Sequence, residues 1–260
     1  MDALRRAGIV LFLGLAAHLA PASAADWSFE VRNRASLPGG AGEYRRVSLT
    51  RGDSAYDADV LILKAGRYAA RLADQLPGHA VSVADVVSSS KAFAGVNGGF
   101  FTESFQPDGL YVVDGKLLSK PLNASILSGV LAIDREGRIR IGPRGTSYAK
   151  SKYAFQAGPM LLHPGGVAGV SRKSTALARR TAIAIGKSDE LIVLASSAVS
   201  LHDLAESLAT LPNAFGADEI DRALNLDGGS STAMSAEVPG KPVHVREWGR
   251  VRTVVLFDLK

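Results

Sequence analysis

One segment of the sequence combines a carboxylate with flexible turn residues and hydroxyl groups. It runs from Ala223 to Met234 and reads ALNLDGGSSTAM. Because alternate residues of a strand share a face, a buried strand here delivers Asn225 and Asp227 to its exit on one side. The turn and hydroxyl residues that follow are Gly228, Gly229, Ser230 and Ser231. Together these groups suit a phosphorylated or polyhydroxyl ligand, and an Asp-Gly turn with a capping serine is the plainer alternative.

Two further glycine-rich segments precede this one. In the first, an apolar strand ends at Asn97 and continues with Gly98, Gly99 and two phenylalanines. Adjacent glycines let the backbone approach a ligand closely, although an ordinary Asn-Gly turn has the same residues. Glu103 lies just beyond the phenylalanines and is a candidate second carboxylate. The other segment contains Gly158-Pro159, which indicates a buried strand followed by a bend.

Positive charge is concentrated between Arg135 and Arg180. This stretch holds one acidic residue, Glu136, and the basic residues Arg135, Arg138, Arg140, Arg144, Lys150, Lys152, Arg172, Lys173, Arg179 and Arg180. A solvated face and a cationic wall for a phosphate group both fit this pattern. Arg180 directly precedes the apolar run that starts at Thr181, so its planar guanidinium is the candidate phosphate ligand.

The elements that position these residues are mostly short strands. Asp114-Gly115, Arg135–Gly137 and Gly186–Asp189 each separate two β-patterned runs, which predicts three hairpins and antiparallel pairing. Three segments are candidate helices: residues 201–211 after the N-cap Ser200, residues 83–92, and a short turn at 218–222. We therefore expect an α+β fold, a large and mostly antiparallel or mixed curved sheet with two or three packed helices, in a single domain.

Composition limits the class of protein. The chain has 260 residues, 47% of them hydrophobic and 21% charged, with a formal net charge of +5 and no cysteine. These values indicate a folded globular protein without disulfides, a thiol nucleophile or a cysteine-based metal site. No His, Asp and Glu set has metal-ligand spacing, so we expect neither a metal nor a cofactor. The low aromatic content of 7% argues against nucleic-acid binding.

The N-terminus has the pattern of a secretory signal peptide. Arg5 and Arg6 precede an apolar run over residues 8–19, and Ala22-Ser23-Ala24 is a small-residue cleavage site. We predict a leader over residues 1–24, a mature domain over 25–260, and a periplasmic or secreted location. An uncleaved membrane anchor is the alternative, but the run is shorter than the ~20 residues a spanning helix needs. We expect no stable membrane insertion after cleavage.

The ordered set of these motifs resembles the phosphodiester glycosidase family. The resemblance runs from about Phe93 to Leu256, most of the mature chain. It is carried by the motifs Asn97-Gly98-Gly99-Phe100-Phe101, Gly158-Pro159, Arg180-Thr181-Ala182-Ile183 and Asn225-Leu226-Asp227-Gly228-Gly229-Ser230-Ser231. The chain departs from the family pattern at Ser230, where a third glycine is frequent, and at Ser196-Ser197-Ala198, where many members have Asp-Gly-Arg.

The resemblance implies hydrolysis of a sugar-1-phosphodiester on the sugar side, with a phosphorylated carbohydrate as substrate. In this interpretation the catalytic residues are Asp227, Asn97 and Glu103. The substrate-binding residues are Arg180, Thr181, Gly98, Gly99, Asn225, Gly228, Gly229, Ser230 and Ser231. Asp227 attacks the anomeric carbon or activates a water, and the two asparagines orient sugar hydroxyls. The alternative is a non-catalytic envelope protein that binds glycans or phosphoglycans, which requires no placed carboxylate.

Overall fold

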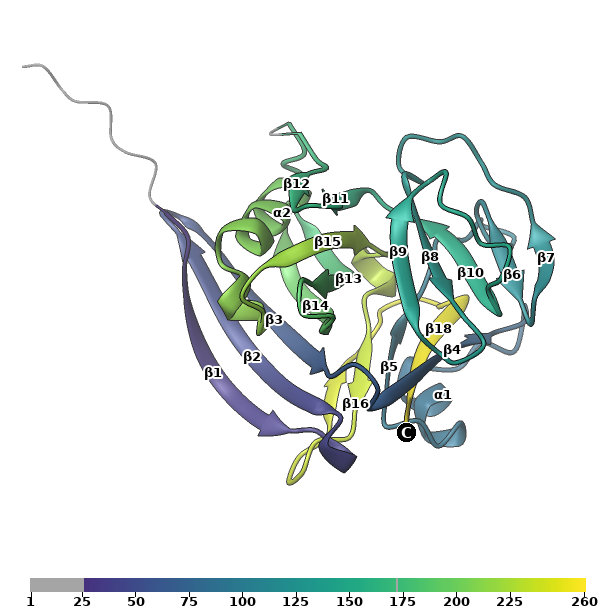
Figure 1. Cartoon of the computed structure of the whole chain (residues 1–260), viewed down its shortest axis with the longest axis horizontal. Coiled ribbons are helices and arrows are strands. Elements are labelled where there is room, and N and C mark those ends of the chain that lie inside the picture. Colours follow the sequence, from purple (N-terminus) through teal and green to yellow (C-terminus); the bar gives the residue numbers. More distant parts are fainter. Residues whose placement is uncertain (1–25, 172) are drawn as a thin grey trace, which may run out of the picture.

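A computed structural model of the chain describes residues 26–171 and 173–260. The predicted leader over residues 1–24 and the basic residue Arg172 lie outside the described residues. Within them, the chain forms three antiparallel sheets and two α-helices in one body (Figure 1).

The largest sheet has eight strands and lies to the left in Figure 1. Its order is β1 (Ser28–Ser36), β2 (Gly42–Arg51), β3 (Ser54–Leu63), β14 (Leu191–Val199), β13 (Ala178–Gly186), β15 (Ile220–Asn225), β11 (Met160–His163) and β12 (Val167–Ala168). The central strands β13, β14 and β15 are buried along most of their length, as expected for strands covered on both faces.

Two five-stranded sheets complete the body. One lies to the right in Figure 1, in the order β7 (Lys116–Ser119), β6 (Tyr111–Val113), β10 (Tyr153–Ala157), β8 (Gly129–Ile133) and β9 (Ile139–Pro143). The other lies below and between the first two, in the order β17 (Val243–Val245), β16 (Met234–Ala236), β5 (Ala94–Asn97), β18 (Thr253–Leu259) and β4 (Tyr68–Asp74).

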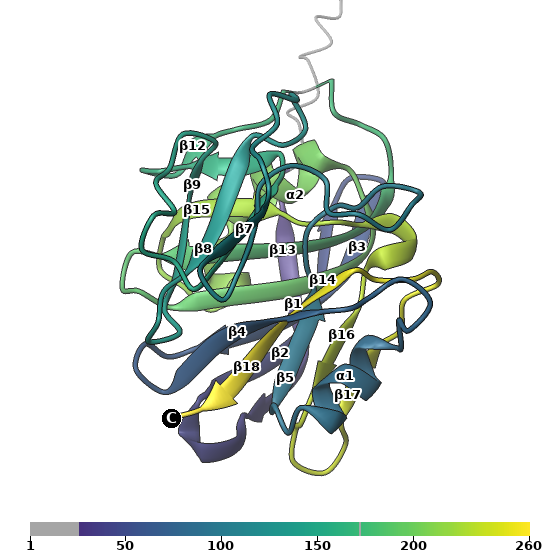
Figure 2. The same ribbon diagram turned by 90° about the vertical axis from the view of Figure 1, so that its right-hand side faces the viewer.

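Each α-helix begins at a serine N-cap. Ser82 accepts a hydrogen bond from the Asp85 N–H at the start of α1 (Val83–Ser89), and Ser200 accepts one from the Asp203 N–H at the start of α2 (Leu201–Thr210). Helix α1 packs on the sheet of β5, β16 and β18, and α2 packs against β11 and β15 (Figure 2). Neither helix of the described chain is long and apolar enough to cross a membrane. Short 3-10 turns occur at η1 (Pro38–Gly40), η2 (Pro212–Phe215) and η3 (Gly229–Ser231).

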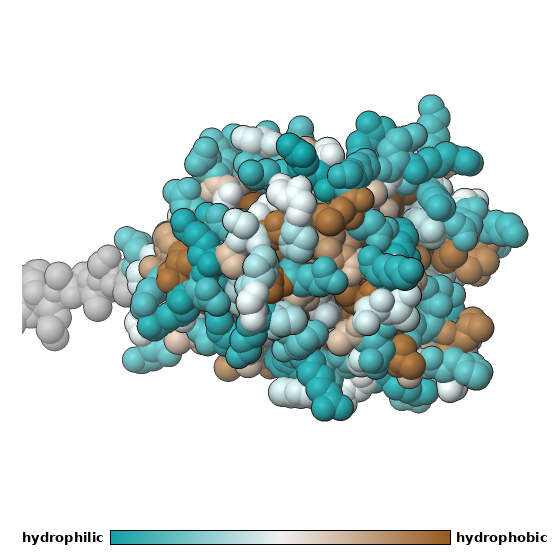
Figure 3. Space-filling model, turned by 90° about the horizontal axis from the view of Figure 1, so that it is seen from below, coloured by the Kyte–Doolittle hydropathy of each residue, from teal (hydrophilic) through white to brown (hydrophobic). Residues whose placement is uncertain are grey.

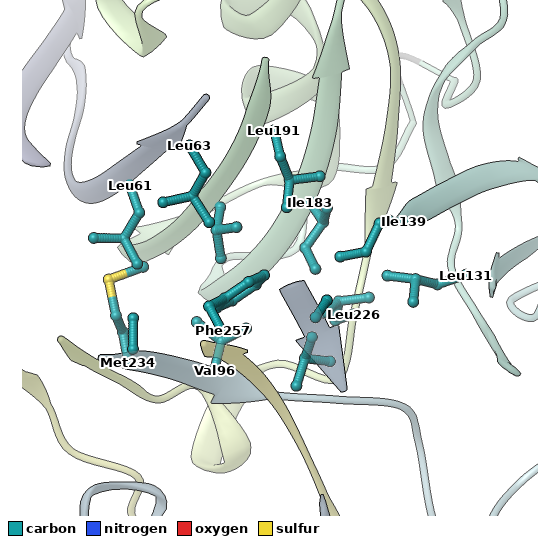
Figure 4. Packing of buried hydrophobic residues seen from close by; sticks show 14 of the residues in the cluster. Leu61, Leu63, Val96, Leu131, Ile139, Ile183, Leu191, Leu226, Met234 and Phe257 are labelled. Carbon is teal, nitrogen blue, oxygen red and sulfur yellow. The ribbon is translucent and has the colours of Figure 1, made fainter. Parts of the chain in front are cut away.

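The main core fills the space where the three sheets face one another. Figure 4 shows side chains from all three meeting there: Leu61, Leu63, Ile183 and Leu191 from the first, Leu131 and Ile139 from the second, and Val96, Met234 and Phe257 from the third. A second core lies on the other face of the eight-stranded sheet, beneath α2. Strand β13 serves both, because Ile183 faces the main core while Ala182 and Ala184 face α2.

The observed fold agrees with the expected class but is more sheet-dominated. The hairpin predicted at Asp114-Gly115 joins β6 to β7, and both turn residues have positive φ, 48° and 75°. The helical turn predicted over 218–222 is wrong, because residues from Ile220 onward extend as β15 between β13 and β11. The expected single large sheet is instead three sheets packed around one core.

The surface seen from below carries hydrophobic residues in small groups separated by hydrophilic ones (Figure 3). Hydrophobic side chains scattered in this way are normal on a folded protein and mark no site by themselves.

Candidate active site

Asp227 lies where the eight-stranded sheet gives way to the third sheet. Strand β15 ends at Asn225, and the chain passes through Leu226 and Asp227 into the single turn η3 before it enters β16. The residues before it are buried, whereas Asp227 itself is partly exposed. A buried strand thus delivers one carboxylate to the edge of the core, as the sequence pattern predicts.

Asn97 joins the two sheets at this point. It is fully buried, its Oδ1 accepts hydrogen bonds from Thr181 Oγ1 (2.6 Å) and the Ala233 N–H (3.0 Å), and its Nδ2 donates to the Asp227 carbonyl (2.7 Å). Thr181 is also fully buried. The Asn97 side chain thus holds the Asp227 backbone and Thr181 holds the Asn97 amide, whereas the sequence predicts a contact between Asn97 and sugar hydroxyls.

Asn225 is likewise turned inward. It is 3% exposed, and its Nδ2 donates to the carbonyls of Gly158 (2.8 Å) and Leu226 (2.7 Å). Its Oδ1 is buried and has no hydrogen-bond partner among the described residues. The amide therefore fixes the turn at the end of β15, and contact between Asn225 and a ligand stays a prediction.

The glycines after Asn97 are required by close packing. A Cβ on Gly98 would lie 2.2 Å from Thr253 Oγ1, and one on Gly99 would lie 2.9 Å from the Phe155 ring. The Gly99 N–H donates to the same threonine hydroxyl at 3.0 Å. Gly98 and Gly99 thus let the chain after Asn97 pack closely against Thr253 and Phe155, and both are buried.

The loop after Asp227 is open to solvent. Gly229 has a left-handed φ of 59°, and no atom lies within 4 Å of the position that a Cβ would take. Ser230 is exposed and Ser231 is 5% exposed. Of the predicted binding residues, Gly228, Gly229 and Ser230 are thus the accessible ones beside the carboxylate.

Burial of the carboxyl raises the pKa of Asp227 from its ordinary value of 3.8 to about 6, even though hydrogen bonds from the Ser231 side chain and the Gly228 N–H lower it. The second of these joins Gly228 N to Asp227 Oδ1 at 2.9 Å. Partial desolvation with few compensating donors leaves the carboxylate more basic than an exposed aspartate. Such perturbed groups are frequent at functional sites.

The two arginines at the start of β13 point in different directions. Arg180 donates to the carbonyls of Val199 (3.1 Å) and Ala176 (2.8 Å), on the strand face shared with Ala182. Arg179 lies beside the loop, because its backbone carbonyl would be 2.8 Å from a Cβ on Gly228. Phosphate binding by Arg180 stays a prediction, and the structure adds Arg179 as a second candidate.

The Arg179 guanidinium combines burial with an unused donor. Nη2 donates to the carbonyls of Thr232 (3.0 Å) and Arg246 (2.9 Å), and Nη1 is buried with no partner among the described residues. Desolvation lowers the pKa of Arg179, which the nearby Glu247 partly offsets. Its charge is therefore only partly compensated by protein groups.

Glu103 makes no contact with Asp227 among the described residues. It lies in an exposed turn between Phe101 and Pro107, and no hydrogen bond or ion pair joins it to Asp227 in the described part of the chain. Its function as a second carboxylate stays a prediction.

The basic region splits into separate parts of the surface. Arg135, Arg138, Arg140 and Lys150 line a cavity of about 1280 Å³ that Asp227 does not line. Arg179 instead lines a cavity of about 630 Å³ together with residues of β14 and the β16–β17 connection. The second cavity has the size of a small-ligand site, but neither Asp227 nor the Gly228–Ser230 loop lines it.

Two residues near the loop were not singled out from the sequence. Thr253, at the start of β18, holds the Gly98-Gly99 turn, and nothing in its local sequence signals this. Trp248 donates its backbone N–H to the Ser230 carbonyl at 2.7 Å and is 77% exposed. The sequence signal for Trp248 is an aromatic residue within a charged run, Arg246-Glu247-Trp248-Gly249-Arg250, where no core strand is expected.

Residues 90–257, more than half of the chain, match the model of the phosphodiester glycosidase family. The chain belongs to this family. The match includes every residue of the site described above. A search of curated proteins gives no match. Among the described residues, no three His, Asp or Glu side chains cluster as ligands for a metal ion.

Solved structures share the fold of this phosphodiester glycosidase family member at low identity. A hypothetical protein from Synechocystis has a TM-score of 0.63 and 16% identity over 84% of this chain, which spans 62% of that protein. The catalytic domain of zebrafish N-acetylglucosamine-1-phosphodiester alpha-N-acetylglucosaminidase, auto-inhibited by its pro-peptide, has a TM-score of 0.59 and 15% identity over 93% of this chain and 85% of that one. A protein from Burkholderia pseudomallei described as exported has a TM-score of 0.53 and 16% identity over 86% and 76%.

Proposed function

We propose that this protein is an exported hydrolase that cleaves the glycosidic bond of a sugar-1-phosphodiester and releases the sugar and a phosphate monoester. The observation that carries the proposal is the partly exposed Asp227 carboxylate beside the open Gly228–Ser230 loop, inside the segment that matches the family. The predicted leader supports a periplasmic or secreted location.

The reaction places its main demand on charge stabilisation. The bond between the anomeric carbon and the phosphate oxygen breaks, water supplies the new hydroxyl on the sugar, and the phosphate keeps the bridging oxygen. A phosphate ester is a far better leaving group than a sugar hydroxyl, so it needs a nearby cation more than a strong general acid. The Arg179 guanidinium donates to the Thr232 carbonyl just after the loop and is our candidate cation, and Arg180 is the sequence-based alternative.

Asp227 supplies the carboxylate that acts at the anomeric carbon. In its ionised form it either attacks that carbon or takes a proton from the attacking water, the two standard functions of a carboxylate in glycoside hydrolysis. Asn97 and Thr181 keep the Asp227 backbone in place through their buried hydrogen bonds. We assign them as positioning residues, with Gly229 and Ser230 facing the substrate.

A hydrolysis screen in oxygen-18 water tests this function. The first substrate is the methyl phosphodiester of N-acetylglucosamine 1-phosphate, because of the name of the zebrafish structural neighbour. The corresponding glucose, galactose and mannose compounds and their nucleotide diphosphates complete the panel. We expect free sugar that carries oxygen-18 on the anomeric carbon and an unlabelled phosphate monoester.

The position of the label separates the possible outcomes. Label in the phosphate means that the phosphorus–oxygen bond is cleaved, and the protein is then a phosphodiesterase, not a glycosidase. Saturable binding without release of sugar from any compound supports the non-catalytic glycan-binding alternative. Asp227→Asn is the control that separates turnover by this site from a contaminating enzyme.

The dependence of activity on pH follows from the raised pKa of Asp227. A carboxylate that acts in its ionised form is half protonated near its pKa of about 6, so kcat/KM should fall tenfold per pH unit below that value and level off above it. Measurement of kcat/KM over a series of pH values below and above 6 tests this decrease on the acid side. A profile that instead falls as the pH rises through 6 contradicts the assignment, because the protonated form is then the active one.

Activity should survive exhaustive chelation. The proposed phosphate contacts come from an arginine and backbone groups, and the site contains one carboxylate with no clustered partners among the described residues. The measurement compares turnover before and after dialysis against EDTA. Loss of turnover with rescue by Ca²⁺ or Mg²⁺ contradicts this prediction and indicates an unrecognised site of oxygen ligands.

A further inference from the structure

Trp248 is the most exposed large hydrophobic side chain of the described residues, at 77%, whereas the chain's other tryptophan, Trp27, is 7% exposed. A tryptophan side chain exposed to water lacks the favourable free energy that its burial normally contributes, so a function at the surface is a reason for its position. Trp248 is not part of a larger apolar patch on its own loop, because its neighbours Arg246, Glu247, Gly249 and Arg250 are charged or glycine.

The backbone around Trp248 is fixed at several points. The N–H groups of Trp248 and Gly249 donate to the Ser230 carbonyl at 2.7 and 3.1 Å. On the preceding side, the Arg246 carbonyl accepts from Arg179, and Glu247 accepts from the Val83 N–H at the start of α1 (2.8 Å). The exposed indole therefore stands on an ordered loop that is bonded directly to the loop after Asp227.

The ring itself is oriented by a cation. The Arg179 guanidinium lies over the indole at 4.4 Å from its centroid, which fixes the plane of the ring. With one face against Arg179 and 77% of the residue exposed, the opposite face remains open to solvent. An oriented, open aromatic face beside polar groups is a surface on which a sugar ring can stack through its C–H groups, since the face of an aromatic ring carries negative partial charge.

We propose that Trp248 is the stacking platform for the sugar ring of the substrate, a specificity-determining residue next to the Asp227 loop. The inference rests on the proposed function for the identity of the ligand. The anomeric carbon must meet Asp227, so the sugar is the part of the substrate held closest to this loop, and Trp248 contacts the loop through Ser230. The exposed Ser230 hydroxyl lies at the rim of the platform, 3.3 Å from a Cβ placed on Gly249.

Fluorescence tests the platform without turnover. In Trp27→Phe, Trp248 is the one remaining tryptophan. The probes are the methyl 1-phosphodiesters of N-acetylglucosamine, glucose, galactose and mannose. Uridine monophosphate is the control, because it is an aromatic ligand that lacks these four sugars. The Asp227→Asn substitution, added to Trp27→Phe, prevents hydrolysis of the probes. We expect a saturable change in Trp248 emission with at least one methyl diester. Iodide quenching of the exposed indole gives the same information in the otherwise unchanged protein if Trp27→Phe does not fold.

Affinity measurements by calorimetry supply the second arm. Trp248→Ala should weaken binding of that diester about tenfold, and Trp248→Phe by less than about threefold, because an aromatic face is retained. Leu118→Ala, a truncation of a 57% exposed side chain on β7 in another sheet, should have no effect. Unchanged affinity in Trp248→Ala, no response to any methyl diester, or a response to uridine monophosphate alone overturns the proposal. Sugar-dependent binding without hydrolysis contradicts the proposed function but supports Trp248 as the stacking platform.

Discussion

Asp227→Asn is expected to lower kcat by about a thousandfold or more, the usual cost of removing an essential catalytic carboxylate. The substitution keeps the shape of the side chain and can still accept the 2.9 Å hydrogen bond from the Gly228 N–H. It removes only the negative charge needed to attack the anomeric carbon or to activate water. The measurement is steady-state release of sugar from the best 1-phosphodiester of the screen, and an active variant eliminates Asp227 as the essential carboxylate.

The stability of the same variant shows whether the fold is intact. The pKa of Asp227 in the folded protein, about 6, lies above its ordinary value of 3.8, so the native state holds the proton more tightly than the unfolded chain. This contribution to stability is complete below about pH 4 and is lost as the pH rises through 6. At pH 8, Asp227→Asn should therefore unfold at a higher temperature than the parent protein, with a gain of about 3 kcal/mol in unfolding free energy.

Asp221→Asn is the matched control in the same strand. Partial burial raises the pKa of Asp221, but the Gly165 N–H and the Arg222 guanidinium lower it more, so its net pKa lies below the ordinary value. This substitution should lower stability at neutral pH and leave kcat nearly unchanged. Opposite signs of the stability change in the two variants separate the Asp227 carboxylate from a general effect of removing charge.

Loss of the guanidinium that holds the phosphate is expected to lower kcat/KM about a hundredfold, or roughly 3 kcal/mol of transition-state stabilisation. We expect this result for Arg179→Ala, because Arg179 lies beside Gly228 and has an unpartnered Nη1 among the described residues. Arg179→Lys keeps the charge but lacks the planar guanidinium, so its kcat/KM should lie between the values of the parent protein and of Arg179→Ala. An activated aryl glycoside of the same sugar should lose less activity than the phosphodiester, because it loses only the support that Arg179 gives to Trp248 and to the Thr232 and Arg246 carbonyls.

Arg180→Ala is the companion variant. Its guanidinium donates to the carbonyls of Val199 and Ala176, so its loss should lower thermal stability and slow both substrates to a similar extent. A phosphate-selective loss in Arg180→Ala, with Arg179→Ala nearly unaffected, would return the assignment to the sequence-based prediction. Kinetic constants for both substrates with all four proteins decide between the two arginines.

Local sequence signals predicted the elements that depend on local chemistry. The serine N-cap and apolar stripe after Ser200 correspond to α2, and the Asp114-Gly115 pair forms the expected hairpin turn. The position of Asp227 at a strand exit is predictable for the same reason, since a strand, an aspartate and two glycines specify such an exit within a few residues. In each case the information lies within one turn or one strand.

Contacts between distant segments could not be predicted in this way. The burial of Asn97 and Thr181 results from the meeting of two sheets, and a sequence pattern does not specify which polar residue lies at such a junction. Residues 218–222 have no strong strand pattern, and those from Ile220 onward extend because they pair with β13 on one side and β11 on the other. Arg179 and Arg180 face opposite sides of the sheet by strand alternation, but the distant carbonyls that their guanidinium groups meet are not specified by local sequence.

The hydrogen bonds that hold Asp227 in place have a consequence for how the site forms. Asn97 reaches Thr181 and Asp227 across 84 and 130 positions of sequence, and Gly99 reaches Thr253 across 154. Contacts of such long range form late and slowly in folding, since a large loop must close before any of them forms. A fragment that lacks either end of the segment from Asn97 to Thr253 cannot contain these contacts of the site. The regain of activity during refolding is therefore a measure of global folding, and a chain kept unfolded for transport carries no active site until it has folded completely.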